Sequence, residues 1–93
     1  MSSDAESFLD VSDLEPPEPL VRALARIGAL KEGQYLRMRH RREPCLLYPN
    51  LEQRGFTHLT RTSGSGFDVF IWRKDDSAAE QAACAAADES LGG

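Results

Sequence analysis

Residues 14–40 read LEPPEPLVRALARIGALKEGQYLRMRH and decide the fold, because a helix start, a helix and a strand follow one another there. Pro19 suits the first turn of a helix, where its missing amide hydrogen is not needed. Apolar residues then recur at the spacing of one helix face: Leu20, Leu24 and Ile27, with Val21 and Gly28 at its margins. This pattern predicts an amphipathic helix from Pro19 to about Leu30, with Arg22 and Arg26 outside and Gly33 ending it.

Strands are predicted on both sides of this helix. Phe8–Val11 is a short apolar stretch bounded by Ser12 and Asp13, which is typical of a strand. In Gln34–His40 the side chains alternate. Leu36 and Met38 fall on the face expected to be buried, and the opposite face carries Tyr35, Arg37 and Arg39.

The second half of the chain predicts a helix and a hairpin. The helix follows Pro44, carries Leu46, Leu47 and Leu51, and ends towards Gly55. Pro49 lies either in its first turn or at a kink. The stretches 56–62 and 67–73 are rich in aromatic and β-branched residues, and the Ser-Gly-Ser-Gly sequence between them predicts an antiparallel hairpin.

The resulting β-α-β-α-β-β order predicts an α+β two-layer sandwich, in which two helices cover one face of a mixed four-stranded sheet. The other face would carry Phe70 and Trp72 beside the residues that alternate with Leu36. These aromatic side chains either meet solvent or another chain, or are covered by the C-terminal segment and arginine stems. We expect a flexible N-terminus at 1–7, a domain at 8–74 and an acidic, Ala-rich, disordered tail at 75–93.

Composition excludes several classes of protein. A chain of 93 residues with 41% hydrophobic residues fits one small domain. The acidic start lacks the features of a secretory signal, and no stretch approaches the roughly 20 apolar residues of a membrane span. We therefore expect a cytoplasmic protein with Cys45 and Cys84 as free thiols.

Charge is distributed unevenly. The tail at 75–93 has a net charge of −5. Because the whole chain has a net charge of −4, residues 1–74 have a net charge of +1. The only basic cluster is Arg37–Arg42, with four arginines around His40. RNA binding through this cluster stays an alternative, although an acidic chain is disfavoured as a nucleic-acid partner.

The segment Leu14–Leu20, with Gly33 and the Ile71–Arg73 strand, resembles the TusA/SirA family of small sulfur carriers over residues 8–74. That family has two helices on a mixed four-stranded sheet and a Cys-Pro-x-Pro signature at its first helix. Pro17-Glu18-Pro19 matches Pro-x-Pro, which puts Pro16 in place of the sulfur-accepting cysteine. Persulfide chemistry is therefore impossible at position 16.

The stretch 42–55, REPCLLYPNLEQRG, strengthens the resemblance to the cysteine-less branch of that family, catalogued as domains of unknown function. Some relatives in this branch accompany hemerythrin-like domains. The resemblance thus implies a link to sulfur or redox metabolism and names no reaction.

Both predicted helix starts should lie at one edge of the sheet, where open α/β sheets place ligands. The candidate binding residues at this edge are Glu15, Pro16, Pro17, Glu18, Pro19, His40, Arg41, Arg42, Glu43 and Cys45. Cys45 is also a candidate thiol near the place vacated at Pro16, with Arg41 and Arg42 favouring the thiolate and Glu43 opposing it. As a metal site, His40, Glu43 and Cys45 have irregular spacing, so we predict no metal and no other cofactor.

No complete catalytic set is present, so the leading hypothesis is a non-catalytic module that binds a protein partner or a small ligand. The first alternative is a sulfur carrier that uses Cys45. The sequence assigns neither the partner nor the oligomeric state.

Overall fold

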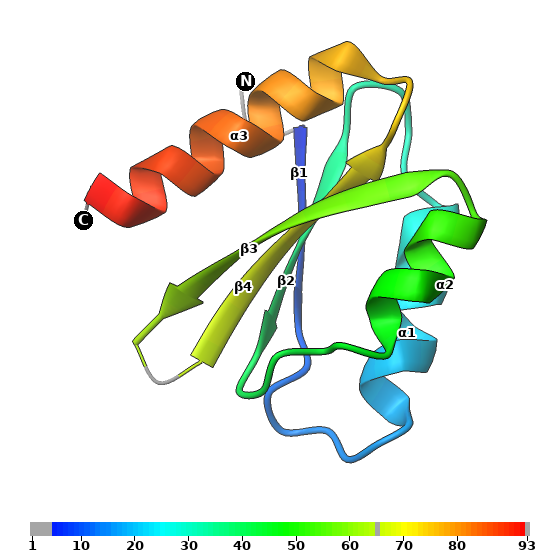
Figure 1. The fold of residues 1–93 in the computed structure, drawn as a ribbon, viewed down its shortest axis with the longest axis vertical. Helices are drawn as coiled ribbons and strands as arrows, with labels where there is room; N and C mark the ends of the chain where they lie inside the picture. The colour runs from blue at the N-terminus through cyan, green and yellow to red at the C-terminus, as the bar shows by residue number, and fades with distance from the viewer. Residues whose placement is uncertain (1–4, 65, 93) are drawn as a thin grey trace.

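The computed structural model describes residues 5–64 and 66–92 (Figure 1). The order of elements is βαβαββα. Their bounds are β1 (Glu6–Asp10), α1 (Glu18–Gly28), β2 (Tyr35–His40), α2 (Leu47–Gln53), β3 (Phe56–Ser63), β4 (Gly66–Arg73) and α3 (Ser77–Gly92).

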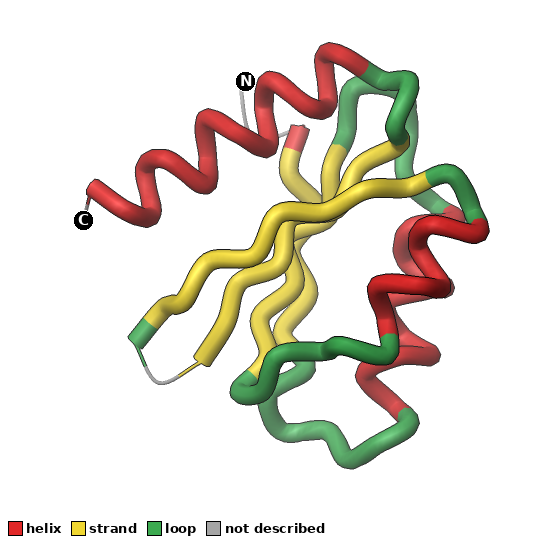
Figure 2. Tube along the Cα trace, in the orientation of Figure 1, coloured by secondary structure: helices red, strands yellow, loops and turns green. Residues whose placement is uncertain are grey.

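The four strands form one sheet in the order β1-β2-β4-β3. β1 and β2 are parallel, whereas β4 is antiparallel to both β2 and β3. The sheet is therefore mixed, and β4 lies between the two strands that α2 connects (Figure 2). This confirms the predicted fold class.

α1 begins one residue before Pro19 and buries Pro19, Ala23 and Ile27. Its last residue is Gly28, two residues short of the predicted end, and Gly33 then turns the chain into β2 with φ +83°. Such a positive φ is readily adopted by glycine alone, as predicted for this position. The predicted stripe was too wide, because Val21 is 55% exposed.

α2 is short, and its first turn contains Pro49, which is the first of the two placements considered. Leu47 and Leu51 are fully buried, and Gly55 follows the helix with φ +82°. Leu46, expected within this helix, is its N-cap residue and is 78% exposed.

The main core lies between the sheet and the two helices α1 and α2, on the right of Figure 1. β2 supplies Leu36 and Met38, and β4 supplies Val69 and Ile71. β3 supplies Phe56, and the helices and flanking segments supply Val11, Ala23, Ile27, Leu30, Leu47 and Leu51. The sheet face predicted for both helices is confirmed.

The C-terminal segment corrects an expectation. Instead of a disordered tail, residues 77–92 form α3, which lies on the face of the sheet opposite α1 and α2 (Figure 1). Ala79, Ala83 and Ala87 are fully buried against Tyr35, Phe70 and Trp72. Of the alternatives for this aromatic face, coverage by the tail is therefore the one observed. Cys84 is half-buried beside this cluster.

Small side chains and a carboxylate explain the order of α3. Alanines at i, i+4 and i+8 form a flat stripe, so the helix packs closely on broad aromatic rings. The Asp76 carboxylate accepts hydrogen bonds from the amides of Gly33 (2.7 Å) and Ala79 (3.0 Å). Asp76 thus caps the helix and ties its start to the turn before β2, and the Gly33 bond holds the pKa of Asp76 below its usual range.

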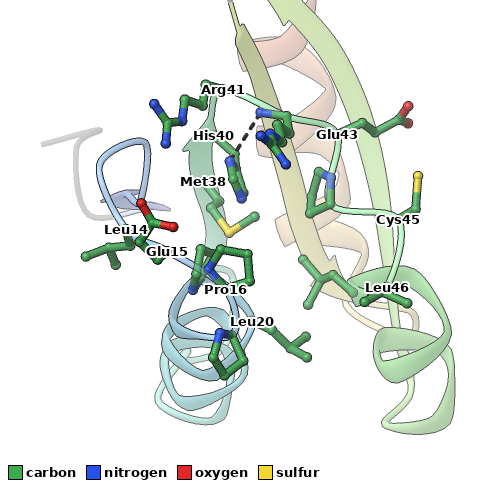
Figure 3. Close-up of a pocket in the computed structure, with 15 residues that line it drawn as sticks. Leu14, Glu15, Pro16, Leu20, Met38, His40, Arg41, Glu43, Cys45 and Leu46 are labelled. Atoms are coloured by element: carbon green, nitrogen blue, oxygen red, sulfur yellow. Dashed lines mark hydrogen bonds between the residues drawn. The ribbon is translucent and has the colours of Figure 1, made fainter.

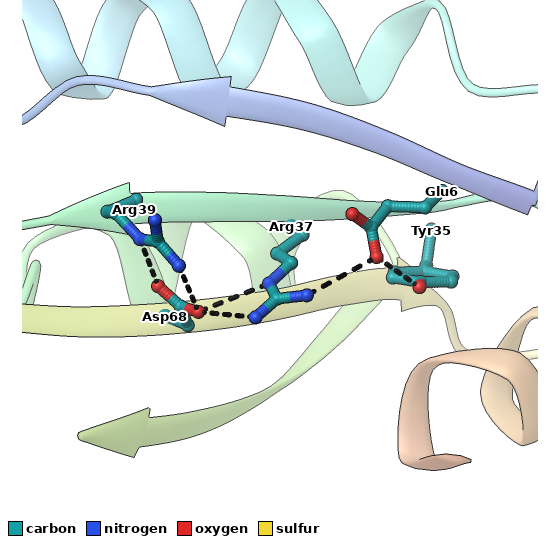
Figure 4. Close-up of polar contacts among 5 residues, drawn as sticks. All are labelled: Glu6, Tyr35, Arg37, Arg39 and Asp68. Carbon is teal, nitrogen blue, oxygen red and sulfur yellow. Dashed lines mark hydrogen bonds and ion pairs between the residues drawn. The ribbon is translucent and has the colours of Figure 1, made fainter. Parts of the chain in front are cut away.

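On the same face of the sheet as α3, Asp68 of β4 is the centre of a polar network, and its side chain is fully buried (Figure 4). Its carboxylate accepts hydrogen bonds from Arg37 (2.9 and 3.1 Å) and from Arg39 (2.9 and 3.1 Å). Arg37 also pairs with Glu6, which accepts the hydroxyl hydrogen of Tyr35. Burial raises the pKa of Asp68, but the bonds from the two arginines outweigh it and lower the pKa below its usual value.

The edge strand β1 begins at Glu6, so residues 6 and 7 are not the flexible segment that was expected. Residues 1–4 of that segment lie outside the described residues. Arg26, expected outside the packed face of α1, donates to the Ser7 hydroxyl (3.0 Å) and to the Phe8 carbonyl (3.2 Å). Across the described ranges 5–64 and 66–92, every helix is too short or too polar to span a bilayer.

The alanine stripe of α3 predicts different effects for the same substitution at a buried and at an exposed alanine. Ala83→Glu places a carboxylate against Phe70 and Trp72, so α3 should detach and the free energy of unfolding should fall by at least about 2 kcal/mol. The emission of Trp72, the single tryptophan, should shift to longer wavelength. Ala85→Glu is the control, because Ala85 is exposed on the same helix. Equal effects of the two changes would contradict the packing described here.

The Asp68 network predicts a pH-dependent stability. Asp68→Asn leaves two arginines without their buried counter-ion and should lower the free energy of unfolding at pH 7 by about 3 kcal/mol. The folded-state pKa lies below 3.8, so the contribution of Asp68 is complete well above pH 3.8 and is lost as the pH falls through the folded pKa. Urea unfolding at pH 7 and pH 3 should show the difference between wild type and variant shrinking at pH 3. A difference independent of pH would argue against this account.

Candidate functional site

A pocket of about 390 Å³ lies between the segments that lead into α1 and α2. The 14–20 segment forms one wall, the 40–47 segment forms the other, and Met38 of β2 lies between them (Figure 3). Both walls follow the carboxyl ends of parallel strands, β1 and β2, which explains why they meet at one edge of the sheet.

Nine of the ten candidate binding residues line this pocket. They are Glu15, Pro16, Pro17, Pro19, His40, Arg41, Arg42, Glu43 and Cys45. Glu18 does not line it: the side chain is exposed on the first turn of α1 and pairs with Arg22 at 3.3 Å. The structure thus brings together the two segments that the sequence placed at one edge.

Six further residues that line the pocket were not among the candidates, and all six are apolar. They are Leu14, Leu20, Met38, Pro44, Leu46 and Leu47. In the sequence, Leu20, Met38 and Leu47 fit core positions, and Leu46 lies directly before Leu47 in the same apolar stretch. The exposure of Leu46 could have been predicted from Pro49. A proline in the first turn puts the start of the helix at Leu47, so Leu46 precedes the helix.

The second wall approaches the sheet closely at Gly66. A Cβ at this position would lie 2.7 Å from the His40 carbonyl oxygen and 3.2 Å from Arg41 Cα. Because both neighbours are backbone atoms, the chain could accommodate a larger residue only by moving the wall. The absence of a side chain at Gly66 therefore allows His40 and Arg41 to lie this close to β4.

His40 extends from the end of β2 into the pocket, towards Pro16 (Figure 3). Its Nδ1 accepts a hydrogen bond from the backbone amide of Arg42 (3.2 Å). Burial lowers the pKa of His40, and the positive charges of Arg41 and Arg42 lower it further. Both effects favour the neutral imidazole over the imidazolium.

Glu43 is held by a network that sequence reasoning missed. Its carboxylate accepts the hydroxyl hydrogen of Tyr48 (3.1 Å), whose oxygen also lies 2.8 Å from the Thr60 hydroxyl. The Tyr48 ring stacks on His58 with centroids 3.8 Å apart. These contacts join the second wall to α2 and β3. No periodic pattern indicated them, since they depend on where β3 lies in the sheet.

Cys45 is exposed on the second wall, and its thiol does not point towards Pro16 (Figure 3). Its backbone amide donates to the Glu43 carbonyl at 2.9 Å. Within the described ranges, the thiol makes no hydrogen bond to an imidazole or carboxylate that could act as its base. Cys45 and Pro16 share the pocket without being direct neighbours in it.

Metal-ligating side chains do not gather at this site. In the part of the chain that the structure describes, no three His, Cys, Asp or Glu side chains lie close enough to hold a metal ion. Both carboxylates of the pocket, Glu15 and Glu43, are exposed. The arrangement can offer hydrogen-bond donors and an apolar surface to a bound molecule.

Two comparisons with known proteins bear on this chain. No curated protein matches it. A family model described as "Uncharacterized conserved protein (DUF2249)" matches residues 8–73, from β1 to the end of β4. This span includes both pocket walls and excludes α3. The expected kinship with TusA/SirA sulfur carriers is not tested by this match and stays a prediction, whereas the match over most of the chain shows that the protein belongs to the DUF2249 family.

Proposed function

We propose that this chain is a non-catalytic module that binds a small organic ligand in the pocket between the 14–20 and 40–47 segments. The observation that carries this proposal is the pocket itself, which combines apolar side chains from both walls with His40 and two arginines. Ligand sites in proteins have this composition, with few polar groups that fix orientation on a mainly apolar surface.

The dimensions favour a small molecule over a protein segment. A volume of about 390 Å³ lies near the lower end of the range for ligand sites. The 40–47 wall lies close against Gly66 and is joined to α2 and β3 by the Tyr48 network, which supports a wall formed before a ligand arrives. A preformed site of this size supports binding of a compact ligand at low ordering cost.

The chemistry at the pocket supports binding rather than turnover. Cys45 is the only thiol there, and no hydrogen-bonded base accompanies it among the described residues. Nucleophilic catalysis needs such a base, or a strongly activated thiol, within reach.

RNA binding receives less support from the structure. Arg37 and Arg39, two of the four arginines of the basic cluster, donate to the buried Asp68 carboxylate. They are therefore engaged within the protein, and a phosphate backbone would have to compete with a buried carboxylate for them.

Leu46 and Val21 provide a matched test of ligand binding. Both are large, exposed apolar side chains, but only Leu46 lines the pocket. A panel of small alcohols, amides and carboxylates should shift the backbone amide resonances of residues 14–20 and 40–47. Leu46→Asp should lower the affinity of the compounds that bind by roughly fivefold, which corresponds to about 1 kcal/mol of lost apolar contact. Val21→Asp should leave their affinity unchanged. A panel that shifts no pocket amide would contradict the proposed function.

A sulfur carrier that uses Cys45 is the second candidate, favoured by the exposure of this thiol at the pocket. In this reaction the Cys45 thiolate attacks the sulfane sulfur of a donor such as thiosulfate. A Cys–S–S bond forms, the donor's S–S bond breaks, and sulfite leaves with the electron pair of that bond. This candidate would retain the link to sulfur metabolism that the TusA/SirA resemblance implied.

Intact mass of the reduced protein after incubation with thiosulfate tests this second candidate. A carrier should gain one sulfur atom, reversible by dithiothreitol, in wild type and Cys84→Ser but not in Cys45→Ser. Wild type without an adduct, or with one that persists in Cys45→Ser, would eliminate it.

A further inference from the structure

The hydrogen bond at His40 fixes which ring nitrogen carries the hydrogen. The Arg42 amide is the donor, so His40 Nδ1 is the acceptor and carries no hydrogen. In the neutral imidazole the hydrogen must then be on Nε2. His40 therefore presents an N–H donor on the edge of the ring away from the Arg42 amide.

This donor is available to a ligand. The ring extends into the pocket towards Pro16 (Figure 3), whose side chain contains no hydrogen-bond acceptor. Among the described residues no side chain or backbone group accepts a hydrogen bond from Nε2. Since the ring is partly buried, an acceptor supplied by a ligand would satisfy a donor that has limited access to water.

The local potential favours an anionic acceptor. Arg41 and Arg42 follow His40 directly in the chain and line the same pocket, so a negative charge beside Nε2 would have two cationic side chains on the same wall. Glu15 and Glu43 also line the pocket; Glu43 is engaged by Tyr48 on the α2 side, whereas Glu15 lies on the opposite wall.

The rest of the pocket suits an apolar body. Leu14 and Leu20 lie on the first wall and Leu46 on the second, so a ligand that reaches His40 also contacts aliphatic side chains from both walls. The size of the pocket admits one short chain or one ring.

We propose that the ligand is a small organic monocarboxylate, whose carboxylate accepts the His40 Nε2 hydrogen while its apolar body lies between Leu14, Leu20 and Leu46. This inference rests on the proposed function and specifies its ligand class. His40 acts as the selecting donor, and Arg41 and Arg42 stabilise the bound charge.

The test compares three six-carbon probes of equal length: hexanoate, 1-hexanol and hexylammonium. Amide resonances of the full chain are followed at pH 7.5 and constant ionic strength, and a long-range ¹H–¹⁵N spectrum reports the tautomer of His40. We expect the Nε2–H tautomer, with hexanoate bound at least fivefold more tightly than 1-hexanol and hexylammonium bound most weakly.

A matched pair of histidine variants isolates the donor. His40→Phe keeps a ring and removes the N–H, so it should weaken hexanoate binding roughly tenfold, as for a hydrogen bond to a charged group, and weaken 1-hexanol binding clearly less, because a hydroxyl oxygen is the weaker acceptor. His58→Phe keeps a ring against Tyr48 outside the pocket and should change neither.

The outcomes distinguish a failure of the carboxylate proposal from a failure of the proposed ligand-binding function. Equal binding of hexanoate and 1-hexanol at the pocket, unchanged hexanoate binding in His40→Phe, or an Nδ1–H tautomer would overturn the carboxylate proposal while leaving a ligand-binding pocket. Absence of pocket shifts with all three probes would overturn both.

Discussion

The structure depends on one central strand, β2, whose alternate side chains serve two different cores. Leu36 and Met38 pack under α1 and α2, whereas Tyr35 packs under α3 and Arg37 and Arg39 bind Asp68. β2 is also hydrogen-bonded on both edges, to β1 and to β4. A shift of one residue in its register would exchange an aliphatic face with an arginine face, so the register is strongly specified.

The same strand also delivers the pocket. Its last residue is His40, and the chain leaves the sheet there to form the second wall. Pairing of β1 with β2 in parallel brings the end of β1, and with it the Pro-rich first wall, to the same edge. The position of the site is therefore a result of sheet topology, while its chemistry comes from the loops that follow the strands.

Sequence patterns predicted the elements that have a period and missed those that depend on a partner. The stripe of α1, the alternation of β2 and the turn glycines all encode local geometry, so their order and the edge where the helices begin could be predicted. α3 has no large apolar residue in its stripe, and only the flat aromatic surface of Tyr35, Phe70 and Trp72 makes an alanine face sufficient for packing. The Tyr48–Glu43 bond and the exposure of Leu46 likewise follow from where neighbouring elements lie, which local spacing does not reveal.

Arg26 covers part of the exposed edge of the sheet at β1. β1 is an edge strand, and an exposed edge offers backbone groups to which a strand of another molecule could pair. Arg26 reaches from α1 over this edge and occupies the Phe8 carbonyl and the Ser7 hydroxyl with its guanidinium. An incoming strand would have to displace a charged side chain before it could extend the sheet, so α1 protects β1 from edge-to-edge aggregation as well as covering the core.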